Sequence, residues 1–107
     1  MSRILILDEI VVKPGLAADY RRAYRARYAP GAERRGMRLE AAWRSPPGQE
    51  FDELPTTLYW LWSVENLEAW WAMRLAERFE KLAWWQESEP MTLSRKRTLL
   101  TDQPQDD

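Results

Sequence analysis

Apolar residues recur along the chain with two spacings, one typical of strands and one typical of helices. The order of these segments constrains the fold more than any other feature of the sequence. Residues 3–13 are rich in branched aliphatic side chains and stop at a Pro-Gly pair, which predicts a strand buried on both faces. Further strand patterns cover residues 37–45, 56–63 and 91–100. One helical pattern follows the first strand and another follows the third. The predicted order is therefore strand, helix, strand, strand, helix, strand.

The first helical pattern carries a stripe of tyrosines. Leu16, Tyr20, Tyr24 and Tyr28 recur every four residues, the spacing of one face of an amphipathic helix. Pro30 and the glycine after it predict that this helix ends there.

The second helical pattern, which ends at Pro90, has two apolar faces. One arc of its helical wheel holds five large side chains, and we expect that arc to pack against the sheet. The five side chains on this arc are Leu67, Trp71, Leu75, Phe79 and Leu82. Beside it runs a flank made by Trp70, Met73 and Trp84.

This order predicts an α+β, ferredoxin-like βαββαβ fold, with a four-stranded antiparallel sheet and both helices on one face. A chain of 107 residues has room for one hydrophobic core. We therefore expect a single domain over residues 1–100 and a flexible acidic tail over residues 101–107.

Two helices leave the other face of such a sheet open, and that face is also apolar. The first strand has apolar side chains pointing both ways, and in the third strand Tyr59 and Leu61 point opposite to Trp60 and Trp62. A second copy of the chain is the simplest cover for this surface. We therefore expect a homodimer formed through the open sheet face.

Several short motifs resemble the dimeric α/β-barrel superfamily, and within it NIPSNAP-type proteins most closely. They are Val12-Lys13-Pro14-Gly15 before the first helix, Trp43, Leu61-Trp62, Glu65-Asn66-Leu67-Glu68, Arg74 and Trp84-Trp85. The resemblance implies the dimeric barrel architecture over nearly the whole chain. It leaves other branches of the superfamily open, including cofactor-independent monooxygenases and cyclases of antibiotic biosynthesis.

Composition excludes several classes of function. The chain has no His and no Cys, which removes histidine and thiolate catalysis, zinc–sulfur sites and histidine-ligated haem. Sixteen basic residues against seventeen acidic ones give no basic surface for nucleic acid. The early apolar run is too short for a signal peptide or a membrane span. We expect a cytoplasmic protein with no metal, no cofactor, and no nucleic-acid or membrane partner.

Asp8 and Glu9 are adjacent in the first strand, so they point to opposite faces and at least one carboxylate should be buried. The last strand lies beside the first in this fold, which brings Arg95, Lys96 and Arg97 within cross-strand reach. The buried carboxylate is either one half of an ion pair that fixes strand register or a general acid or base in a pocket. We take Asp8 as the candidate for the catalytic role.

Arg27 lies within about 20° of Leu16 and Tyr20 on an ideal helical wheel, which places its stem against the sheet. Its head group either extends to solvent from the helix end or recognises an anion, enolate or carbonyl inside the cleft. In the second case Arg27 is a catalytic candidate, and Tyr20, Tyr24 and Tyr28 supply phenolic donors to a substrate.

Three more aromatic residues are candidate walls of the substrate pocket, because their strands line the space between helices and sheet. These are Trp43, Tyr59 and Trp62. Trp70, Trp84 and Trp85 are candidates for the subunit contact instead. Aromatic side chains at these spacings are also ordinary core residues, which is the competing interpretation for most of them.

The sequence therefore favours a dimeric protein that binds a polycyclic or otherwise apolar metabolite. The resemblance implies a cofactor-free tailoring reaction of the monooxygenase, cyclase or dehydratase type in bacterial secondary metabolism. A non-catalytic binding or protein-interaction module of the NIPSNAP type is the alternative.

Overall fold

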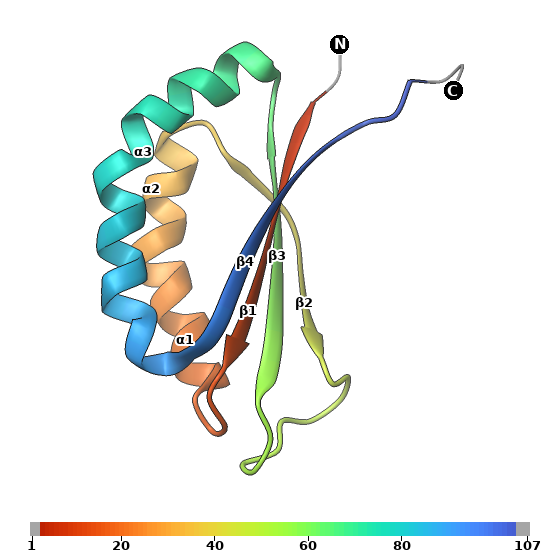
Figure 1. The fold of residues 1–107 in the computed structure, drawn as a ribbon, viewed down its shortest axis with the longest axis vertical. Helices are drawn as coiled ribbons and strands as arrows, with labels where there is room; N and C mark the ends of the chain where they lie inside the picture. Colours follow the sequence, from red (N-terminus) through yellow and green to blue (C-terminus); the bar gives the residue numbers. More distant parts are fainter. Residues whose placement is uncertain (1–2, 105–107) are drawn as a thin grey trace.

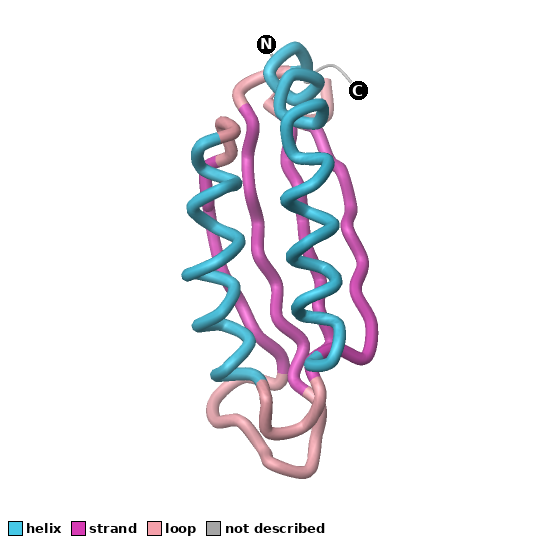
Figure 2. Tube along the Cα trace, turned by 90° about the vertical axis from the view of Figure 1, so that its left-hand side faces the viewer, coloured by secondary structure: helices cyan, strands magenta, loops and turns pink. Residues whose placement is uncertain are grey.

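The computed structural model describes residues 3–104, with side chains placed for all of these except residues 76–80. Four antiparallel strands form one sheet in the order β2-β3-β1-β4, with both helical segments on one face (Figures 1 and 2). The strands are β1 (Ile4–Val12), β2 (Arg38–Ser45), β3 (Thr56–Val64) and β4 (Thr92–Thr101). The ferredoxin-like βαββαβ prediction is confirmed.

The first helical segment runs without a break through α1 (Ala17–Ala23), a π-helical turn (Tyr24–Tyr28) and α2 (Ala29–Arg34). The predicted end near Pro30 is wrong, because the helical segment continues through Pro30 to Arg34, with the π turn directly before the proline. Ahead of it, the Ala29 N–H donates to the Tyr24 carbonyl, which is the i→i+5 bond of a π turn.

The segment ends instead at Gly36, whose φ of 98° suits a residue without a Cβ. Met37 N–H donates to the Ala32 carbonyl at 3.0 Å, and Gly36 N–H donates to the Glu33 carbonyl at 3.0 Å. This pair of bonds is a Schellman motif, and Met37 and Ala32 are both buried beside it.

The second helical segment is α3 (Leu67–Ser88), followed by a short 3₁₀ turn (Glu89–Met91) that contains Pro90. Asn66 is its N-cap, and the Asn66 side chain accepts a hydrogen bond from the Ala69 N–H at 2.8 Å. The helix therefore begins directly after Asn66.

The face of α3 that packs on the sheet is not the predicted one. Leu75 is 82% exposed and Trp71 is 54% exposed, and Leu67 and Leu82 are also exposed. Met73 and Trp84 are buried instead, because Trp84 meets the tyrosines of the first helix. A helical wheel gives the angles between side chains but not which of two apolar arcs meets the sheet. Phe79, also placed on the predicted arc, lies outside the described side chains.

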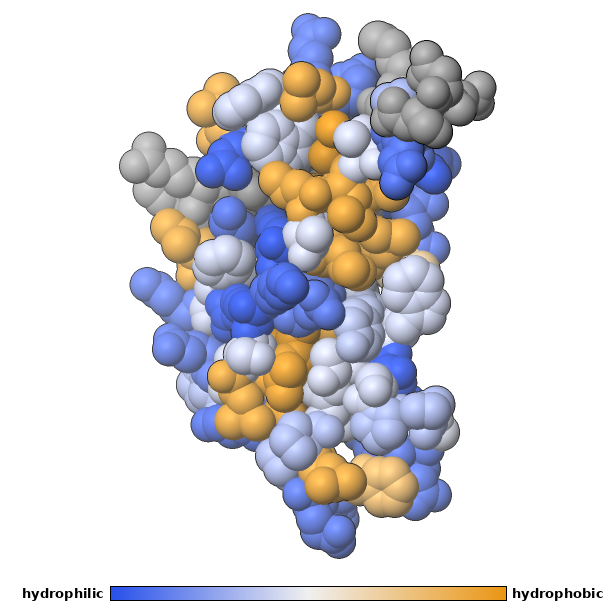
Figure 3. Space-filling model, turned by 45° about the vertical axis from the view of Figure 1, so that its right-hand side comes forward, coloured by the Kyte–Doolittle hydropathy of each residue, from blue (hydrophilic) through white to orange (hydrophobic). Residues whose placement is uncertain are grey.

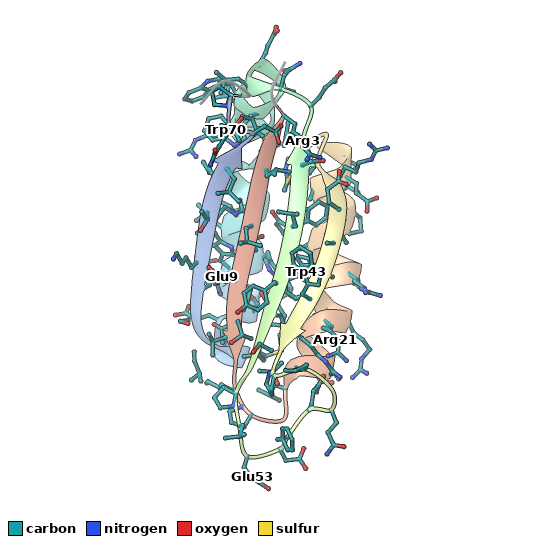
Figure 4. All side chains as sticks on the ribbon, turned by 90° about the vertical axis from the view of Figure 1, so that its right-hand side faces the viewer. Arg3, Glu9, Arg21, Trp43, Glu53 and Trp70 are labelled. Atoms are coloured by element: carbon teal, nitrogen blue, oxygen red, sulfur yellow. The ribbon has the colours of Figure 1, made fainter. Side chains whose placement is uncertain are left out.

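Alternate residues divide the sheet into a covered and an open face. In β1 the even-numbered side chains from Ile6 to Val12 are buried beneath the helices, and the odd-numbered ones from Leu5 to Val11 are half-buried. The sequence predicted that both faces of β1 are buried. In this single chain, only the face beneath the helices is buried. Apolar side chains gather on part of the open side, and Glu9 and Trp43 lie on that face (Figures 3 and 4).

β4 continues to Thr101, so the predicted tail begins one residue later than expected. Its last residues, 105–107, lie outside the described part of the chain. Within residues 3–104, no helix has both the length and the apolar content that a bilayer crossing requires.

Candidate functional site

A cavity of about 200 Å³ lies between the helices and the covered face of the sheet. Its walls combine aromatic rings from both helical segments with charged residues of β1, a central strand, and β4, an edge strand. The lining residues are Asp8, Ile10, Tyr20, Tyr24, Tyr28, Trp84, Trp85, Arg95, Lys96 and Arg97. Charged groups and phenols therefore converge on one partly enclosed space, which makes this cavity the candidate site.

Asp8 anchors a polar network on the floor of the cavity. It lies opposite Arg97 in the β1–β4 ladder, so Arg97 is the partner among the three basic residues that the sequence placed within cross-strand reach. Arg97 donates from Nε to Asp8 Oδ1 at 2.7 Å and from Nη2 to Asp8 Oδ2 at 3.0 Å. The structure thus turns Asp8, rather than Glu9, toward the helices and places it in the ion pair that the sequence offered as one interpretation.

Two tyrosines extend this network toward the helix. Tyr28 Oη accepts a hydrogen bond from Arg97 Nη2 at 2.9 Å, and Tyr24 Oη donates a longer one to Asp8 Oδ2 at 3.4 Å. Burial alone would lower the pKa of Arg97, but its hydrogen bonds and attraction to Asp8 outweigh burial and raise that pKa. Arg97 therefore stays charged and holds Asp8 in place.

The π turn keeps the tyrosines in one column. The ring centroids of Tyr24 and Tyr28 are 5.0 Å apart, and those of Tyr20 and Tyr24 are 6.2 Å apart. Tyr24 also stacks on Trp60 with centroids 3.8 Å apart. An ordinary α-helix has fewer residues in each turn than a π turn has. Side chains four residues apart on an α-helix are therefore rotated relative to each other around the helix axis, and this offset accumulates along the helix. The wider turn reduces that offset between Tyr24 and Tyr28.

The phenols of this column are hydrogen-bonding groups rather than bases. Burial is the main influence on Tyr20 and raises its pKa to about 12. Burial, followed by the nearby Asp8 carboxylate, raises the pKa of Tyr24 well above its ordinary value. Both phenols therefore remain neutral at physiological pH and can donate their protons in hydrogen bonds.

Arg95, Trp84 and Trp85 are site residues whose place in the cavity the sequence did not predict. Arg95 lies over the Trp85 ring, 5.2 Å from its centroid, and its Nη2 donates to the Trp85 carbonyl at 3.2 Å and to Ser88 Oγ at 3.4 Å. The assignment of Trp84 to the subunit contact is wrong, because it is 4% exposed and packs on the tyrosines. The usable signal was the spacing of Met73, Trp84 and Ser88, which places them on one arc of α3.

Arg27 does not enter the cavity. It is exposed and forms an ion pair with Glu87 of α3, so the prediction that its stem lies against the sheet is wrong. The prediction assumed an ideal α-helix, and the π turn that contains Arg27 changes the direction of its side chain. No contact places it near Asp8 or the cavity within the described residues.

Two of the three predicted wall residues lie on the other side of the sheet. Trp43 and Tyr59 face each other across the β2–β3 ladder on the open face, because their register position is opposite to that of Trp60. Trp62 does face the helices, but it is fully buried and donates from Nε1 to Tyr24 Oη at 2.7 Å. It supports the tyrosine column from behind rather than lining the cavity.

The donor set is not that of a metal site. Among the side chains that the structure describes, in residues 3–75 and 81–104, no three carboxylates, histidines or cysteines come together in a group that could hold a metal ion.

Comparisons with known proteins relate this chain to others by fold. No protein-family model matches it, and no curated protein gives a significant match. Among solved structures, a NIPSNAP domain protein from Burkholderia xenovorans is 13% identical, with 95% of this chain and 96% of that one covered at a TM-score of 0.69. A NIPSNAP family protein of unknown function from Agrobacterium tumefaciens is 10% identical, with coverage of 94% and 87% and a TM-score of 0.70.

A candidate antibiotic biosynthesis monooxygenase from Bordetella bronchiseptica is also similar. It is 18% identical, with 97% of this chain and 98% of that one covered at a TM-score of 0.59. At these identities the likeness concerns the fold. The ferredoxin-like architecture and the structural resemblance to NIPSNAP proteins are thus confirmed.

Proposed function

We propose that this protein binds a small aromatic molecule in the cavity between its helices and its sheet, and acts on it without a cofactor. The observation that carries the proposal is the enclosed space bounded by aromatic rings, neutral phenols and the Asp8–Arg97 pair. Apolar pockets with a few converging polar groups are the usual form of small-molecule sites. The fold shared with the Bordetella protein supports a tailoring reaction of the monooxygenase, cyclase or dehydratase type.

The size of the cavity limits the ligand. A dry protein cavity of about 150 Å³ holds benzene. A volume of about 200 Å³ therefore suits a single ring with one or two small substituents rather than the polycyclic metabolite considered from the sequence.

The groups present suit a reaction that proceeds through a phenolate or enolate. Neutral phenols and guanidinium groups stabilise developing negative charge on oxygen, and they do so best when held in place before the reaction. Asp8 is held by Arg97 through both oxygens, so its part is to orient the donors around the ligand. The reactivity itself comes from the bound aromatic molecule.

A matched pair of substitutions tests the binding site. Tyr28→Phe removes a phenol beside the cavity, and Tyr59→Phe removes one on the opposite face of the sheet. We expect the affinity for phenol, measured by tryptophan fluorescence, to fall several-fold in Tyr28→Phe, since one hydrogen bond contributes about 1 kcal/mol. Tyr59→Phe should bind as the natural chain does. Equal loss in both variants, or loss in Tyr59→Phe alone, would place the ligand elsewhere.

The open sheet face supports a second part of the proposal, a homodimer formed through that face. Leu5, Leu7, Val11 and Leu61 are half-buried there although nothing covers them in a single chain. Sedimentation equilibrium at micromolar concentration should give twice the 12.8 kDa mass of the chain. A mass of one chain across that concentration range would disprove the dimer.

The outer face of α3 favours the alternative of an interaction module. Leu67, Trp71, Leu75 and Leu82 form an exposed apolar row, which is typical of a surface that contacts another protein. Failure of phenol and other single-ring compounds to bind the natural chain would favour this alternative over the small-molecule site.

A further inference from the structure

We infer that the cavity selects an aromatic acid, whose carboxylate binds Arg95 while its ring lies among the tyrosines and tryptophans. This inference rests on the proposed function, because it names the chemical class of ligand for the same cavity.

Among the described residues, Arg95 is a cation lining the cavity for which no ion pair is found. Arg97 is balanced by Asp8 at 2.7 Å. Lys96 lies opposite Glu9 in the β1–β4 ladder, on the open face of the sheet. Arg95 lies opposite Ile10, and among the described residues no carboxylate comes within ion-pair distance of it. A partly buried cation without a counter-charge is costly unless a ligand supplies one.

Arg95 is also held in a position from which it can bind an anion. Its guanidinium lies over the Trp85 ring, and both of its hydrogen bonds, to the Trp85 carbonyl and to Ser88 Oγ, use Nη2. A guanidinium carries five N–H donors, so those on Nε and Nη1 are available to a ligand. That edge of the group matches the two oxygens of a carboxylate.

Tyr20 supplies a second donor, because it lines the same cavity as Arg95. Burial is the main influence on the pKa of Tyr20 and raises it, and the positive charge of Arg95 only partly offsets that rise. The Tyr20 phenol stays neutral and can donate to an oxygen that Arg95 also contacts. The adjoining rings of Tyr24 and Trp84 give the aromatic part of the ligand an apolar surface.

A pair of probes of nearly equal shape tests the inference. Benzoate and benzamide differ in charge but little in size, and both are single rings that suit the cavity. We expect tryptophan fluorescence to show benzoate binding about tenfold or more tightly than benzamide, as a charge-assisted pair of hydrogen bonds requires. Arg95→Gln should abolish the preference, because it leaves no positive charge at this position to pair with the carboxylate.

Two further variants keep the test decisive. Arg95→Lys retains the charge and should retain a reduced preference for benzoate, even if Arg95→Gln fails to fold. Arg27→Gln removes an arginine outside the cavity and should bind both probes as the natural chain does. Equal affinities for the two probes in the natural chain would overturn this inference and leave the proposed function standing. Failure of both probes to bind would overturn the proposed function itself.

Discussion

Replacing Arg97 with methionine should lower the free energy of unfolding by about 3–5 kcal/mol. The substitution leaves the Asp8 carboxylate in a buried position without its bidentate partner, and it also removes the donor to Tyr28. Charged groups in such positions are destabilising when they lose their partner. Urea denaturation followed by tryptophan fluorescence measures the change.

A surface pair provides the control for this substitution. Arg3 and Asp102 form an ion pair at 3.5 Å with both side chains about half exposed, so Arg3→Met should cost less than about 1 kcal/mol. Adding Asp8→Leu to Arg97→Met should recover much of the lost stability, because an apolar pair leaves no buried charge. A cost below about 1 kcal/mol for Arg97→Met would show that Asp8 is hydrated rather than enclosed.

Trp84→Ala should destabilise the fold by about 3–5 kcal/mol, whereas Trp71→Ala on the same helix should cost less than about 1 kcal/mol. Trp84 is 4% exposed and packs on Tyr20, Tyr24 and Tyr28, and Trp71 is 54% exposed. The two changes are chemically identical, so their difference reports which face of α3 meets the sheet. Thermal or urea denaturation measures both.

The reverse order of the two effects would contradict the observed packing. A larger loss in Trp71→Ala than in Trp84→Ala would restore the arc of Leu67, Trp71 and Leu75 as the inner face of α3. Equal and small losses would mean that Trp84 contributes little to the core.

The sequence predicted the layers of the molecule because strand and helix periods are local properties. Alternation in residues 56–63 and the four-residue spacing of the tyrosines each depend on a few neighbouring side chains. The order of these elements then led to the ferredoxin-like topology. The neighbouring positions of the first and last strands followed from the same order, but the pairing of Asp8 with Arg97 in particular came from the structure.

The orientation of side chains was harder to predict because it depends on partners distant in the sequence. Arg27 was misplaced by a π turn that has no simple signature in the residues around it. Trp43 and Tyr59 were misplaced because alternation separates two faces without saying which one the helices cover. Arg95 was considered only as a partner for Asp8, and its contacts with Trp85 and Ser88 depend on how α3 lies over β4.

The position of the ligand is the central claim, and the indole N–H resonances of the seven tryptophans test it most directly. In a ¹⁵N-labelled sample titrated with benzoate, we expect the signals of Trp84 and Trp85 to shift, while those of Trp43 and Trp71 stay in place. Single Trp→Phe variants assign each signal. Shifts confined to Trp43 and Trp71 would contradict the account, because they would place the aromatic molecule outside the cavity.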